Sequence, residues 1–70
     1  MQHTHPALTH YANAAHHTEN GRWDIAAREI DAALSLACND YAFDNTEGDR
    51  LIAAMQDLAA RVNREAFYTA

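Results

Sequence analysis

The chain has 70 residues, enough for one domain, and at that size apolar burial only narrowly exceeds the conformational entropy lost on folding. Its formal net charge is −5 and every basic residue is an arginine, so the sequence lacks the basic patch that direct nucleic-acid binding requires. No apolar run approaches the ~20 residues that cross a bilayer, and the single cysteine, Cys38, has no partner for an internal disulfide. We therefore expect a cytoplasmic protein that binds neither nucleic acid nor membrane.

The first expected helix covers residues 6–18. Pro6 suits the first helical turn, where a backbone N–H is not needed. Four apolar residues then follow the spacing of one helical face: Leu8, Tyr11, Ala12 and Ala15. Asn20-Gly21 ends this helix, because glycine adopts the left-handed conformation that closes a helix C-terminus.

The second expected helix covers residues 22–38 and has the strongest periodic pattern in the chain. Its core face is predicted to hold Trp23, Ala26, Ala27, Ile30, Ala33, Leu34, Ala37 and Cys38. The preceding loop is so short that the first two helices must form an antiparallel hairpin. We expect Trp23 to wedge into this hairpin and Cys38 to behave as a small buried hydrophobe.

Turn-forming residues interrupt the pattern at 39–45, although Tyr41 and Phe43 are large enough to fold back over the core. The third expected helix covers residues 46–66, with the Thr46 hydroxyl capping the amide of Asp49. Its buried stripe is predicted to hold Leu51, Met55, Leu58 and Val62, with Ile52, Ala59 and Ala66 beside it. The fold class is therefore predicted to be all-α: one domain over residues 1–70, in which a third helix packs on the hairpin to form a three-helix bundle.

Residues 7–38 resemble a single tetratricopeptide-repeat hairpin. The matching positions are the glycine turn, the aromatic after it, the small residues and the later Ala-Leu-x-Leu pattern: Ala14, Gly21, Trp23, Ala26, Ala33, Leu34 and Leu36. His10, Asn13 and His17 depart from the pattern, because that family prefers large apolar residues there. Repeat arrays stack about three or more units, so here the third helix takes the place of a neighbouring repeat. The resemblance implies protein–protein interaction and does not imply catalysis.

Five histidines lie within the first seventeen residues, and imidazole is a common ligand for zinc, copper and nickel. His10 and His17 share one helical face, and His3 with a free amino terminus matches a square-planar nitrogen site for Cu(II) or Ni(II). No nearby cysteine or carboxylate completes a zinc spacing. Solvated or packed histidines are thus the favoured interpretation, no cofactor is expected, and a histidine-based metal-binding protein is an alternative function.

No nucleophile–base pattern or phosphate-binding loop is present, so we expect a protein that is not an enzyme. Acidic residues crowd the middle of the chain, where a solvated loop is the ordinary interpretation. The candidate partner-binding residues are Asp40, Tyr41, Phe43, Asp44, Glu47 and Asp49. Short, acidic, alanine-rich chains whose only basic residues are arginines resemble accessory proteins of phages and mobile elements, including anti-CRISPR inhibitors. The leading hypothesis is a protein-binding module that occludes a basic nucleic-acid-binding surface of its partner; a regulatory or structural homodimer is a further alternative.

Overall fold

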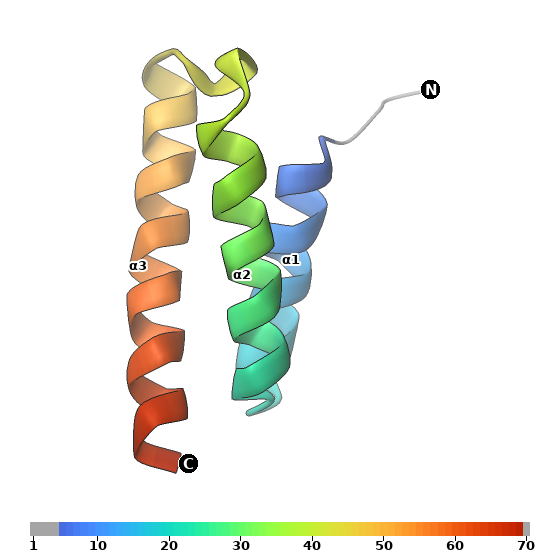
Figure 1. Cartoon of the computed structure of the whole chain (residues 1–70), viewed down its shortest axis with the longest axis vertical. Helices are drawn as coiled ribbons and strands as arrows, with labels where there is room; N and C mark the ends of the chain where they lie inside the picture. The colour runs from blue at the N-terminus through green and yellow to red at the C-terminus, as the bar shows by residue number, and fades with distance from the viewer. Residues whose placement is uncertain (1–4, 70) are drawn as a thin grey trace.

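The computed structural model describes residues 5–69, with the side chains of residues 5–67. Its elements are α1 (Pro6–Glu19), α2 (Trp23–Cys38), the 3₁₀-helix η1 (Tyr41–Phe43) and α3 (Thr46–Thr69). Each α-helix runs antiparallel to the one before it, so α1 and α3 point in the same direction (Figure 1). The predicted all-α three-helix bundle is confirmed, and no strand occurs among the described residues. Within that part of the chain, no helix has both the length and the hydropathy needed to cross a membrane.

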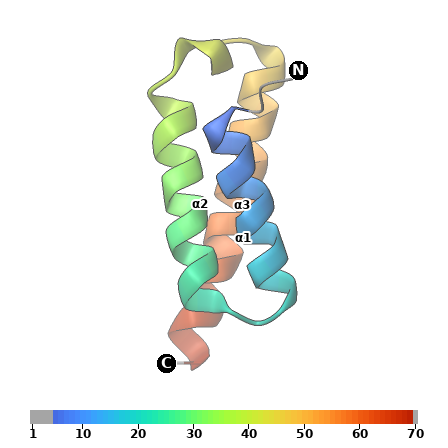
Figure 2. The same cartoon turned by 90° about the vertical axis from the view of Figure 1, so that its right-hand side faces the viewer.

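The central element of the bundle is α2, which packs closely against both α1 and α3. By contrast, α1 and α3 touch each other only lightly. Figure 2 shows α1 and α2 in front, joined by their turn, with α3 behind them. Leu8 and Tyr11 of α1 and Leu51 and Leu58 of α3 pack on the core but stay half-buried. The bundle therefore leaves apolar side chains of its two outer helices partly uncovered.

Small residues bring α1 and α2 together. The buried alanines of the two helices are Ala7, Ala14, Ala26, Ala33 and Ala37. Thr18 is buried among them and its hydroxyl donates to the Ala14 carbonyl oxygen at 2.7 Å, which satisfies the polar group. Ala12 is exposed, so its predicted place on the core face was wrong. Closely packed helices favour the smallest side chains at their line of contact, which moves the centre of the α1 face to Ala7 and Ala14.

The turn between α1 and α2 is closed by backbone hydrogen bonds. The Arg22 amide donates to the His17 carbonyl at 2.9 Å, and the Gly21 amide donates to the Thr18 carbonyl at 3.2 Å. Gly21 has φ +70°, the left-handed conformation that this C-terminal motif requires. The predicted glycine turn is confirmed.

Three residues predicted for the core face of α2 lie outside the core: Trp23 and Cys38 at opposite ends of the helix, and the half-buried Ala27 between them. Trp23 is only half-buried and is not part of the core cluster, because it is the first helical residue and lies beside the turn. Cys38 is exposed, because it follows the buried Ala37 and is rotated about 100° from it. Instead, the largest fully buried side chains of the described residues are Ile30 of α2 and Met55 and Val62 of α3, and Ile30 and Met55 belong to the same core cluster.

The start of α3 also differs from the prediction. The Asn45 side-chain oxygen accepts from the Gly48 amide at 2.7 Å, so Asn45 caps the helix and Thr46 is its first residue. Asn and Thr are both good capping residues, and only the path of the chain out of η1 decides which of them stands at the boundary. At the other end, α3 continues three residues beyond the expected boundary, to Thr69.

Candidate protein-binding site at the loop end

The loop end of the bundle, residues 39–49, links α2 to α3 and contains all the predicted partner-binding residues. The Asp40 carboxylate caps η1 by accepting from the Ala42 amide at 2.9 Å. Phe43 is 7% exposed and joins the core, whereas Tyr41 is 90% exposed. Residues two apart on a 3₁₀-helix project in different directions, so only one of these aromatics can face inward. Phe43 folds over the core as expected, and Tyr41 is left for solvent or a partner.

Gly48 lets the loop approach α3 very closely. A Cβ atom at this position would lie 2.0 Å from the Phe43 carbonyl oxygen, a distance that no side chain tolerates. Gly48 was not among the residues predicted from the sequence. The available signal was a glycine in the first turn of a helix, where glycine is unfavourable unless close packing needs it.

His5 ties the start of α1 to the loop end. Its Nδ1 accepts from the Ala7 amide at 3.0 Å, so the ring proton lies on Nε2, which donates to Asp40 Oδ2 at 2.6 Å. The imidazole and the Phe43 ring also pack edge to face, with centroids 4.9 Å apart and planes at 88°. The hydrogen bond from His5 is the main reason, and that from the Ala42 amide the second, why the pKa of Asp40 is lowered from its ordinary value of 3.8. Asp40 is thereby held in place as an anion.

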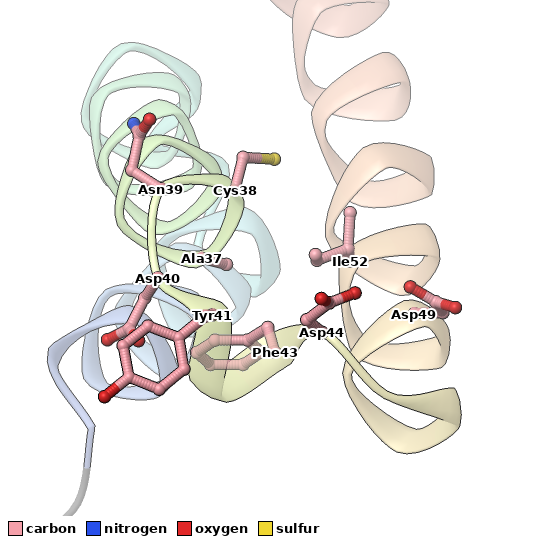
Figure 3. A pocket seen from close by; sticks show the side chains of 9 residues that line it. All are labelled: Ala37, Cys38, Asn39, Asp40, Tyr41, Phe43, Asp44, Asp49 and Ile52. Atoms are coloured by element: carbon pink, nitrogen blue, oxygen red, sulfur yellow. The ribbon is translucent and has the colours of Figure 1, made fainter.

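A recess of about 320 Å³ opens between the end of α2, η1 and the start of α3. Figure 3 shows Asp40 and Tyr41 on its α2 side and Asp44 and Asp49 on its α3 side, with Phe43 between them. The remaining lining residues are Ala37, Cys38, Asn39 and Ile52. This recess combines three carboxylates and an exposed phenol ring with a few apolar side chains, Ile52 among them.

The four predicted acids do not share one surface. Asp40, Asp44 and Asp49 line the recess, whereas Glu47 does not. Glu47 and Asp49 are two residues apart on α3 and therefore project about 200° from each other. Residues 40–50 contain four acids and a single arginine, Arg50, so this end carries three of the five net negative charges.

A second recess, of about 390 Å³, lies on the α1 side of the same loop. It is lined by His5, Pro6, Ser35, Leu36, Asn39 and Asp40. Asn39 and Asp40 line both recesses and form the ridge between them. Because His5 occupies one oxygen of Asp40 on this side, the acidic character of the loop end is concentrated in the first recess.

The candidate metal ligands are not brought together. His10 Nδ1 donates to Glu29 Oε2 at 2.5 Å, which links α1 to α2 and is the main cause of the lowered pKa of Glu29. His17 Nδ1 is buried and has no hydrogen-bond partner. In the described part of the chain, no three His, Cys, Asp or Glu side chains are grouped so that they could hold a metal ion. His3 lies outside the described residues.

Cys38 was predicted to be buried in the core, but it is exposed in the first recess, among carboxylates and without a lining histidine. Comparison with protein-family models, with curated proteins and with solved structures finds no match in any of the three.

Proposed function

We propose that the chain is a non-catalytic protein-binding module whose acidic recess binds a basic surface of a protein partner. The observation that carries this proposal is the set of three carboxylates, Asp40, Asp44 and Asp49, around a recess with the 90% exposed Tyr41 ring at its edge. Arginine suits such a recess best. Its planar guanidinium pairs with carboxylates and stacks on aromatic rings, and its aliphatic stem packs on apolar surface such as Ile52.

The recess is pre-organised by contacts beneath it. His5 and the Ala42 amide hold Asp40, Phe43 is anchored in the core, and the Asn45 cap sets the first turn of α3 that carries Asp49. A partner that binds here orders few side chains on this chain, which lowers the entropic cost of association.

A basic surface on the partner that normally contacts nucleic-acid phosphates would be occluded by this end of the bundle. The protein would then act as a stoichiometric inhibitor, since an enzyme-like turnover is not needed for occlusion. Negative charges at fixed spacing steer such encounters and raise the association rate at low ionic strength.

The first experiment is a pull-down with the tagged chain from its native host, read by mass spectrometry, followed by association kinetics with the recovered partner. The test variant is D40N/D44N/D49N, in which each amide keeps one acceptor oxygen and the packing. The matched control is E19Q/D24N/D31N, which removes the same number of charges from exposed positions of α1 and α2. We expect the test variant to associate roughly ten-fold more slowly at low salt, and the control to stay near wild type.

The difference between the two variants should shrink as added salt shortens the Debye length below about 8–10 Å. Equal association rates for the two triple variants at low salt would contradict the proposal. A separate pair of variants tests the aromatic edge: Tyr41→Ala should speed dissociation, whereas Tyr41→Phe, which keeps the ring, should not.

A further inference from the structure

One face of α3 has an unusual order of residues. Positions at alternating spacings of four and three, which align along one side of a helix, are Glu47, Leu51, Ala54, Leu58 and Arg61. The face therefore begins with an acid, continues through three apolar residues and ends with a base. Such an order complements itself when two copies run antiparallel, and opposes like charges when they run parallel.

This face of α3 is only partly covered by the rest of the chain. Leu51, Ala54 and Leu58 are half-buried, and Glu47 and Arg61 are exposed. The light contact between α1 and α3 leaves Leu8 and Tyr11 half-buried as well, beside the same core. Among the described residues only Ile30, Met55 and Val62 are large and fully buried, so further apolar burial would add substantially to a thin core.

The charges along α3 favour one register. When the α3 helices of two copies pack antiparallel with their Ala54 residues opposite each other, Glu47 of one copy faces Arg61 of the other. The same register places Arg50 close to Asp57 of the second copy on the flank of the interface. All four charged residues are exposed, and within the described part of the chain none of them forms an ion pair. Two-fold symmetry forms each of these contacts twice.

We propose that the chain forms an antiparallel homodimer through this face of α3, with Glu47 of each copy paired to Arg61 of the other. The acidic recess lies elsewhere on the loop end, because Asp49 projects about 200° from Glu47 around α3. The dimer thus carries two recesses at opposite ends and, where each recess acts as proposed above, binds two basic sites at once. The dimer does not depend on the proposed function of the recess.

The test is a charge exchange measured by sedimentation equilibrium. Wild-type protein should sediment at twice the chain mass of 7.8 kDa at micromolar to millimolar concentration. Glu47→Arg and Arg61→Glu each create two like-charge contacts and should each weaken dimerisation roughly ten-fold or more. The double variant E47R/R61E should restore it, and an equimolar mixture of the two single variants should form a heterodimer.

Matched controls carry the same charge changes on exposed positions of α2: Asp31→Arg for the first substitution and Arg28→Glu for the second. They should dimerise like wild type, and circular dichroism should show all variants equally helical. A wild-type chain that stays monomeric at millimolar concentration would overturn the proposal. So would single variants that dimerise as tightly as their controls, or a double variant no tighter than the singles.

Discussion

The two ends of the bundle reverse the chain by different means. At the turn end, residues 20–22, one glycine and hydrogen bonds between neighbouring backbone groups close α1 and start α2. At the loop end, groups far apart in the sequence converge: His5 reaches Asp40 across 35 positions, and Phe43 lies both on the core and against Gly48. The turn end therefore depends on local conformation and the loop end on tertiary packing.

The largest loss of stability is expected for a substitution at Gly48, which should disrupt the packing of the loop end. Gly48→Ala places a Cβ on the Phe43 backbone, which cannot move without displacing the buried ring. The free energy of unfolding should fall by about 3 kcal/mol or more, as judged by urea unfolding followed by circular dichroism. A loss below about 1 kcal/mol would show that the loop end relaxes freely and does not depend on close tertiary packing.

The aromatics at the two ends give the next test. Phe43→Ala at the loop end should cost about 3 kcal/mol, because the ring is buried in the core cluster. Trp23→Ala at the turn end should cost only about 1–2 kcal/mol, because its larger ring is half-buried. Urea unfolding of both variants measures the two losses of unfolding free energy. A loss for Trp23→Ala equal to or above that for Phe43→Ala would contradict the view that the loop end depends more on tertiary packing than the turn end.

Gly21 tests the turn end directly. Gly21→Ala should cost about 1–2 kcal/mol, because alanine is strained at the observed φ of +70° even though nothing lies near its Cβ. Gly21→Asn is the matched variant and should recover part of this loss, since asparagine tolerates the left-handed region better than other residues. Thermal unfolding of the two variants side by side gives the answer; equal losses would mean that strain at this residue is unimportant.

The smallest effect concerns acid pH. Hydrogen bonds from His5 and His10 lower the pKa values of Asp40 and Glu29 from their ordinary values of 3.8 and 4.5, so both carboxylates stabilise the folded chain above those ordinary values. That stabilisation is lost as the pH falls below them and the carboxylates take up protons. Melting temperatures should therefore drop below about pH 4.5, and E29Q/D40N should show a shallower drop than D31N/D24N. Parallel melting curves for the two double variants would show that the two histidine contacts add nothing.

Much of the fold could be predicted because its determinants are local. Pro6 at a helix start, Gly21 at a left-handed turn and the period of Ala26, Ile30 and Ala33 each act through the chain within one or two turns. These patterns correctly placed three helices and their antiparallel order. The acids of the loop end were equally visible, since their density along the chain does not depend on the fold.

The remaining features needed the packed molecule. Whether Cys38 or Ala37 faces the core, and whether Asn45 or Thr46 caps α3, depends on the rotation of each helix about its axis, which its neighbours set. The same rotation separates Glu47 from the acids of the recess and leaves it on the face with Leu51 and Arg61. His5 became part of the site because the hairpin returns the chain to its starting end, a long-range closure that no local pattern encodes.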